Sequence, residues 1–105
     1  MKYVISLVGR AGTTQSKAST DTAQLLTDAV TIPNGCISAV ITCETNNVRI
    51  AFGTNPTQAG LGHLLYVGQS YKIGNPQAVR DFRFISAANG VHGLIQVTPE
   101  TKMGA

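Results

Sequence analysis

The stretch that decides the fold runs Ile37-Ser-Ala-Val-Ile-Thr-Cys43, then Glu44-Thr-Asn-Asn47, then Val48-Arg-Ile-Ala-Phe52. In the first and third segments, apolar residues occupy every second position. Side chains of an extended strand point alternately to its two faces, so this period of two predicts strands with one buried face. The middle segment breaks the pattern with residues that favour turns. We therefore predict strands at 37–43 and 48–52, paired as a β-hairpin.

The same pattern continues outward from this stretch. We predict further strands at 63–67 and 70–73, paired across a tight Gly68-Gln69 turn, and at 82–85 and 91–98, the last ended by Pro99. Phe82 and Phe84 should share one face of their strand. The only helix candidate, 22–30, is short. Many short strands separated by turn residues predict an all-β fold, an antiparallel β-sandwich or jelly roll of about seven to eight strands with an extended N-terminal arm.

Length and composition predict a single domain over residues 1–105. Only 13 of the 105 residues are charged, eight basic and five acidic, whereas Ser, Thr, Asn and Gln together number 30. A disordered chain carries more charge and fewer apolar residues than this one. We therefore expect a compact body whose surface is wetted mainly by neutral polar groups.

The excess positive charge lies at the N-terminus. The first 20 residues hold Lys2, Arg10 and Lys17 and no acid, whereas the rest of the chain is balanced. Residues 9–22 are polar and fit neither strand nor helix periodicity, so we predict a polar arm or long loop. Three cations are few for nucleic-acid binding, which typically uses about 6–10 phosphate contacts, so no nucleic-acid partner is expected. The simpler interpretation is that the three side chains are ordinary solvated cations; the alternative is a basic arm that lies on an acidic protein partner.

No membrane partner or export signal is expected either. The apolar run at 3–8 is much shorter than the ~20 residues of a membrane-spanning helix. It also lacks the pattern of a signal peptide. We interpret it as a strand of a protein made in the cytoplasm.

The sequence offers no pattern for catalysis or metal binding. Cys36, Cys43, His63 and His92 are separated by intervals that do not fit the usual spacings of zinc ligands. No nucleophile motif, facing carboxylate pair or phosphate loop is apparent. We predict a non-enzymatic protein without metal or cofactor. The two cysteines should be free, packed thiols, and on one regular strand they would face opposite sides.

Tyr66 and Tyr71 flank the predicted Gly68-Gln69 turn and form a possible surface aromatic patch. Exposed tyrosines can stack on sugars, which leaves a carbohydrate-binding module open. The alternative, that both rings pack on the core or its edge, is the simpler interpretation. A neutral surface also suits a flat contact with another protein, because charged residues are depleted at interface cores.

One further pattern spans residues 36–98. It consists of Val48–Gly53, Asn55-Pro56-Thr57, Gly62–Leu65, Val67–Ser70, Phe82–Ser86 and the closing strand Leu94–Val97. This succession resembles small structural proteins of tailed bacteriophages; residues 1–35 lie outside it. The resemblance implies a virion protein, in particular a capsid decoration (cement) protein. Its partners would be the major capsid protein and further copies of itself, as a homodimer or homotrimer on the capsid surface. A fibre, tail or neck component, or a carbohydrate-binding attachment module, is the alternative.

Overall fold

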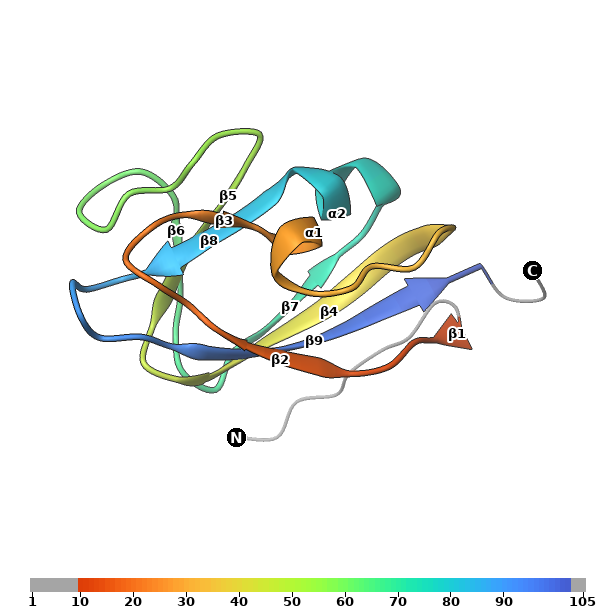
Figure 1. The fold of residues 1–105 in the computed structure, drawn as a ribbon, viewed down its shortest axis with the longest axis horizontal. Helices are drawn as coiled ribbons and strands as arrows, with labels where there is room; N and C mark the ends of the chain where they lie inside the picture. Colours follow the sequence, from red (N-terminus) through yellow and green to blue (C-terminus); the bar gives the residue numbers. More distant parts are fainter. Residues whose placement is uncertain (1–9, 103–105) are drawn as a thin grey trace.

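The computed structural model describes residues 10–102, which form two antiparallel β-sheets that face each other (Figure 1). The first sheet has the order β1-β9-β4-β7, with β2 also pairing with β9; the second has the order β3-β8-β5-β6. The strands of the first sheet are β1 (Arg10–Ala11), β2 (Gln15–Ala18), β4 (Cys36–Thr45), β7 (Ser70–Ile73) and β9 (Leu94–Thr101). Those of the second are β3 (Gln24–Leu25), β5 (Val48–Phe52), β6 (His63–Leu65) and β8 (Phe82–Ser86). The prediction of a mostly β, antiparallel chain is confirmed.

The hydrophobic core lies between the two sheets. Alternate side chains of β4 and β9, among them Ile41 and Val97, meet those of β5 and β8, among them Ile50. Phe82 and Phe84 are fully buried in this core, on the face of β8 predicted for them, with ring centroids 6.4 Å apart. The fold therefore follows from the period of two in its long strands.

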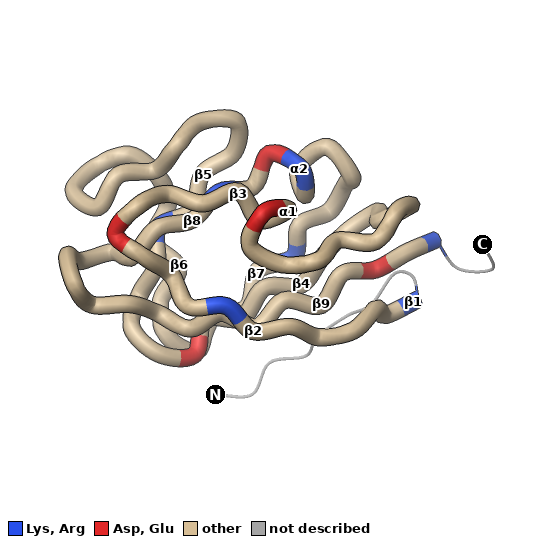
Figure 2. Tube along the Cα trace, in the orientation of Figure 1, with Lys and Arg blue, Asp and Glu red and all other residues tan. Residues whose placement is uncertain are grey.

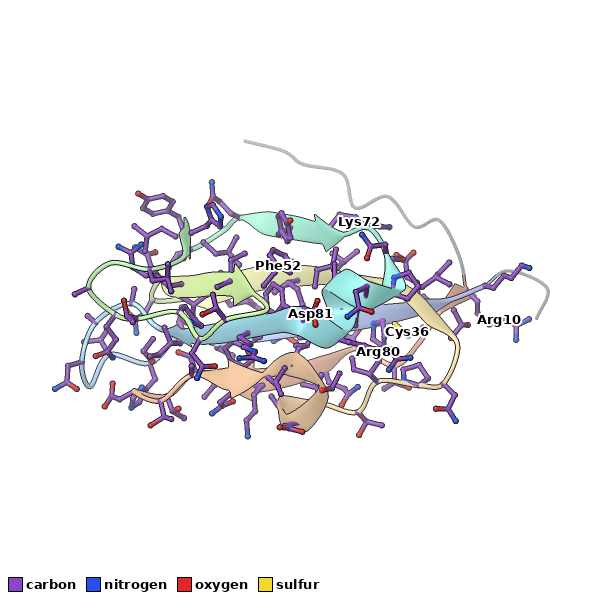
Figure 3. All side chains as sticks on the ribbon, turned by 90° about the horizontal axis from the view of Figure 1, so that it is seen from above. Arg10, Cys36, Phe52, Lys72, Arg80 and Asp81 are labelled. Atoms are coloured by element: carbon purple, nitrogen blue, oxygen red, sulfur yellow. The ribbon has the colours of Figure 1, made fainter. Side chains whose placement is uncertain are left out.

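A β-bulge places both cysteines in the core. The register between β4 and β9 shifts between Cys36 and Ser38, so the alternation restarts one residue later. Cys36 and Cys43 therefore belong to the same buried cluster instead of facing opposite sides, and both are free thiols; Figure 3 labels Cys36. The prediction of free, packed thiols is confirmed, whereas the prediction of opposite faces for a regular strand is wrong.

The predicted hairpins are wrong, although their strands exist. β4 pairs with β7 and β9 in the first sheet, whereas β5 pairs with β6 and β8 in the second. The 46–47 turn therefore carries the chain across the core from one sheet to the other. The same holds for β6 and β7, which the turn at 66–69 joins. From β2 onward, every connection except β5 to β6 changes sheet. Alternating burial fixes which residues face the core, but a strand can meet that requirement in either sheet.

The prediction of an arm or long loop at 9–22 is wrong for residues 10–11 and 15–18, which form strands. β1 and β2 both pair with β9, with Arg10 opposite Thr101 and Lys17 opposite Ile95. Backbone hydrogen bonds to a neighbouring strand need no apolar side-chain pattern, so periodicity could not reveal this edge. The predicted strand at 3–8 lies outside the described residues.

Pro99 does not end the last strand, contrary to the prediction. β9 continues to Thr101, and the Pro99 carbonyl accepts a hydrogen bond of 2.7 Å from the Gly12 amide. The nitrogen of Pro99 faces the same side, toward the gap between β1 and β2. Proline is tolerated in a sheet where no ladder donor is required, and this gap provides such a position.

Two short helices connect the sheets. α1 (Leu26–Ala29) is one turn within the segment 22–30 that held the only helix candidate. α2 (Pro76–Asp81) was not predicted, although its signals are present in the sequence. The Asn75 side chain accepts a hydrogen bond of 2.8 Å from the Ala78 amide, and Pro76 occupies the first turn. Asparagine at the N-cap followed by proline is a typical helix start.

The loop from Gly53 to Gly62 folds against the outer face of the second sheet. Arg49 and Arg83 alternate with core residues, so both project outward from this sheet. Arg49 donates hydrogen bonds to the carbonyls of Gln58 and Gly62, at 3.3 and 3.1 Å. Arg83 donates to the Asn55 side chain at 3.0 Å. These cations therefore hold a loop in place, and both are half-buried.

Candidate protein-binding surface

Four connections meet at one end of the molecule, which we call the loop end: residues 19–23, 46–47, 66–69 and 87–93. In Figure 1 it lies on the left. Hydrogen bonds join the connections directly. The Ala87 amide donates to the Asn47 carbonyl at 3.2 Å, and the Gly90 amide donates to Asp21 Oδ1 at 2.9 Å. The loop end is thus one hydrogen-bonded unit assembled from both sheets.

Two asparagines hold the centre of the loop end. Asn46 has a positive φ of 52°, a conformation that asparagine tolerates better than most residues. Its side-chain amide donates to the His92 carbonyl at 3.0 Å. The side-chain oxygen of Asn47 accepts from the Val67 amide, also at 3.0 Å. The pair therefore ties the β4–β5 turn to both neighbouring connections, which makes the surface above it preorganised.

A shallow hollow of about 270 Å³ opens at this end. Among described residues it is lined by two asparagines and four aliphatic side chains: Asn46, Asn47, Val67, Ala87, Ala88 and Val91. Val67 is 50% exposed, Val91 44%, and the adjacent Tyr66 51%. Large apolar side chains this exposed, gathered around an uncharged hollow, mark a surface that can bind an apolar partner.

A chain of polar groups supports the loop end from below. The Ser19 and Ser86 hydroxyls lie 2.7 Å apart, and Ser86 Oγ lies 2.9 Å from His92 Nδ1. Ser19 Oγ also accepts from the Gly93 amide at 2.8 Å. Both hydroxyls are buried, at 1% and 0% exposure. Because no substrate can reach a fully buried hydroxyl, this chain acts as a structural tie between the two sheets.

Asp21 is the ionisable group most clearly affected at the loop end. The Gly90 amide stabilises its carboxylate and lowers its pKa from the ordinary value of 3.8. A second hydrogen bond, 2.9 Å long, comes from the Gln58 side chain, which belongs to the loop over the second sheet. Asp21 thus connects three segments that are distant in sequence.

The predicted aromatic pair divides between two features. Tyr66 lies on the loop end, where its backbone amide donates to Gln69 Oε1 at 2.9 Å. Tyr71 lies on β7 opposite Ile41, and its ring centroid is 6.2 Å from that of Phe52, which packs against the core. Tyr71 lines a different groove, of about 310 Å³, together with Phe52 and Leu64. Tyr71 thus packs at the edge of the core, whereas about half of the Tyr66 surface is exposed to solvent.

Arg10 and Lys17, the described members of the predicted basic group, do not line the hollow at the loop end. Arg10 lies at the opposite end of the molecule (Figure 3), and Lys17 lies on β2 opposite Ile95, two residues before the loop end begins. Lys2 lies outside the described residues. Figure 2 shows how sparsely charges occur along the described chain. Whether Arg10 and Lys17 contact a partner stays a prediction.

One ion pair is located on the outer face of the first sheet. Lys72 Nζ lies 2.6 Å from Glu100 Oε1, and the Ser38 hydroxyl donates to the same oxygen at 2.7 Å. Glu100 and Ser38 are both fully buried. Nothing in the sequence distinguishes Glu100 from the four other acids, so sequence patterns could not identify this buried carboxylate.

The described residues can also be examined for a metal site, a membrane-spanning helix and a reactive thiol. Within residues 10–102, no group of three or more His, Cys, Asp or Glu side chains is placed to hold a metal ion. In the same part of the chain, no helix has the length and apolarity needed to cross a membrane. Burial raises the pKa of the Cys43 thiol, which donates to the Asn46 carbonyl at 3.0 Å. A thiol in this state is a poor nucleophile.

A larger hollow of about 490 Å³ lies beside β1 and β2, lined by Gly12, Thr13, Gln15, Thr31, Pro33 and Pro99. The Gln15 side chain bonds both the amide and the carbonyl of Thr31, at 2.8 and 2.6 Å. The polar groups of the Gln15 side chain are therefore already hydrogen-bonded. None of the large exposed hydrophobic residues of the described chain lines this larger hollow. We therefore take the loop end as the candidate binding surface.

Sequence reasoning selected Tyr66 but missed Val67, Val91 and the two asparagines. The available signal was local: each valine adjoins a turn glycine, at Val67-Gly68 and Gly90-Val91, where an aliphatic side chain cannot be buried easily. Comparison with known proteins found no matching family model, no matching curated protein and no matching solved structure.

Proposed function

We propose that this protein is a non-enzymatic structural component of a tailed-bacteriophage virion, a decoration protein that binds the outer surface of the capsid through its loop end. We further propose that the fold is a jelly roll. The strand orders β2-β9-β4-β7 and β3-β8-β5-β6, with connections that alternate between sheets, support this topology. Jelly rolls are frequent among viral capsid and lectin domains, an analogy of fold that suggests a setting without fixing a function.

The observation that carries the proposal is the apolar hollow at the loop end, whose lining residues carry no charge. Val67, Val91 and Tyr66 are each about half exposed around the hollow. The core of a protein–protein interface is depleted in charge and enriched in aromatic residues. The hydrogen bonds of Asn46 and Asn47 fix this surface before binding, which reduces the entropy lost on association.

A decoration protein needs no catalytic group. Binding to the assembled lattice alone stabilises that state by mass action. A homodimer or homotrimer that engages several capsid subunits at once would gain avidity without additional contacts in each copy. The major capsid protein is therefore the expected partner, and the capsid surface the expected location.

The experiment is co-sedimentation of the purified chain with expanded, empty shells of a tailed phage that carries this sequence. We expect the wild-type chain to pellet with shells, and Val67→Asp to weaken binding at least about tenfold, about 1.4 kcal/mol, by placing a charge in the interface. The matched control is Leu61→Asp, because Leu61 is also 50% exposed but does not line this hollow. Absence of wild-type binding refutes the function, whereas equal loss in both variants refutes the assignment to the loop end.

The copy number per purified particle separates this proposal from a fibre, tail or neck component. Hundreds of copies support a decoration protein, whereas about a dozen support one of the other parts.

A carbohydrate-binding attachment module is the second candidate, favoured by the exposed ring of Tyr66. Stacking of a sugar would require this ring in solution. A glycan array tests the idea with the wild-type chain and Tyr66→Ala. Specific signal that Tyr66→Ala removes supports the module; silence of the wild-type chain rejects it.

A further inference from the structure

Two Asn-Gly pairs of this chain occupy equivalent turns. In residues 33–36, the Cys36 amide donates to the Pro33 carbonyl at 3.2 Å; in residues 88–91, the Val91 amide donates to the Ala88 carbonyl at 3.1 Å. The glycine in each turn has a positive φ, 79° in the first and 73° in the second. This is the pattern of a type II turn with Asn and Gly at its two central positions.

The surroundings of the two pairs match as well. Both asparagines and both glycines are exposed. A Cβ atom placed on either glycine would meet no heavy atom within 4 Å. Local sterics and solvent access therefore do not distinguish the pairs.

An exposed Asn-Gly pair can deamidate without an enzyme. The glycine backbone nitrogen, after losing its proton, attacks the side-chain carbonyl carbon of asparagine. A new C–N bond forms, the bond to the side-chain nitrogen breaks, and ammonia leaves from a cyclic succinimide. Water then opens the ring to aspartate or isoaspartate. The reaction consumes only water, and it requires a backbone N–H that can be deprotonated.

The two backbone N–H groups differ in this respect. The Gly90 amide donates to Asp21 Oδ1 at 2.9 Å. Deprotonation there would break a charge-assisted hydrogen bond and place a second negative charge beside a carboxylate. Among residues 10–102, no side chain or backbone carbonyl accepts a hydrogen bond from the Gly35 amide. Its proton is open to hydroxide in the solvent.

We propose that Asn34 is a site of spontaneous deamidation in this protein and that the Asp21 carboxylate protects Asn89 from the same reaction. Asn34 precedes β4, whereas Asn89 lies on the loop end. The new negative charge therefore accumulates away from the loop end. This inference does not depend on the proposed function.

The experiment is incubation of the full folded chain in mildly alkaline buffer, followed by peptide mapping with mass spectrometry and an isoaspartate assay. We expect Asn34 to react at least about tenfold faster than Asn89, the factor that corresponds to losing one hydrogen bond to a charged group. Asp21→Asn should raise the rate at Asn89 and leave that at Asn34 unchanged. Asn34→Gln should remove the main product.

A second measurement covers the case in which Asp21→Asn does not fold. In the wild-type chain unfolded by denaturant, the two sites should react at comparable rates, because both have the sequence Asn-Gly. Equal rates in the folded chain would overturn the proposal. So would a difference between the sites that persists in the unfolded chain, since Asp21 could not then be its cause.

Discussion

Replacing Gly93 with alanine tests whether the loop end is a rigid assembly. Gly93 is buried between the β4–β5 turn and the Ser19 side chain. A Cβ atom at this position would lie 2.5 Å from the Asn46 carbonyl oxygen and 2.8 Å from that of Thr45. It would also lie 2.8 Å from a methyl group of Val48. Two of these three contacts are with backbone, so no rotamer change can relieve them.

The expected cost has two parts. Overpacking a well-packed site typically costs about 1–3 kcal/mol. Moving the β4–β5 turn aside would also weaken the hydrogen bond from Asn46 to the His92 carbonyl and that from the Cys43 thiol to the Asn46 carbonyl. Each such bond contributes about 1 kcal/mol. We therefore expect Gly93→Ala to lower the free energy of unfolding by about 3–5 kcal/mol, a large share of the ~5–15 kcal/mol of a typical domain.

The assay is urea unfolding followed by circular dichroism, with Gly74→Ala as the matched control. A Cβ atom on Gly74 would meet no heavy atom within 4 Å, and Gly74 does not have a positive φ. That substitution should be neutral or stabilise by up to about 1 kcal/mol, because alanine reduces the entropy of the unfolded chain. If the free energy of unfolding of Gly93→Ala lay within about 1 kcal/mol of that of the wild type, the reasoning would be refuted. The backbone of the loop end could then move to accommodate a methyl group.

Three further predictions concern polar ties. Ser86→Ala should lower the free energy of unfolding by about 1–3 kcal/mol, because it leaves the buried Ser19 hydroxyl and His92 Nδ1 without their Ser86 partner. Ser16 is exposed, so the control Ser16→Ala should leave the free energy of unfolding almost unchanged in the same urea titration. Glu100→Gln should lower the free energy of unfolding by about 3 kcal/mol. This is the low end for breaking a buried ion pair, because Lys72 is partly exposed. Glu44 is exposed, so the control Glu44→Gln should be nearly neutral. For Asp21, a lowered folded-state pKa means that its stabilisation is present above the ordinary pKa of 3.8 and is lost as the pH falls through the folded value. Stability measured from neutral pH to below that range should therefore fall less for Asp21→Asn than for wild type; equal slopes would contradict this.

The strands of this protein were predictable from the sequence, but the pairing of the strands was not. Alternation in 37–43 and 48–52 depends on which side chains face the core, and that property is the same whichever sheet a strand joins. At the turn where the chain crosses the core, Asn46 has a positive φ and its side chain bonds the His92 carbonyl, which holds the turn in that course. His92 is 46 residues away in the sequence. A contact at that separation leaves no local pattern.

The candidate site was even less accessible to sequence reasoning. Tyr66 could be selected because exposed tyrosine has a recognisable use, whereas an aliphatic residue such as Val67 normally indicates core. The bulge at Cys36 had the same effect on the cysteines: a one-residue shift reversed the face on which the first of them lies. Insertions of this kind are fixed by packing around the whole strand.

Several of the few charges of this chain act as internal ties, which changes what its net charge means. Arg49 and Arg83 hold the loop over the second sheet. Glu100 is buried against Lys72, and Asp21 bonds the Gly90 amide. A charge that is satisfied inside the molecule contributes little to long-range attraction of a partner. Under the proposed function, binding would therefore depend on shape and apolar contact. A substitution in the hollow at the loop end, whose lining carries no charge, should then alter binding more than one in the basic N-terminal segment.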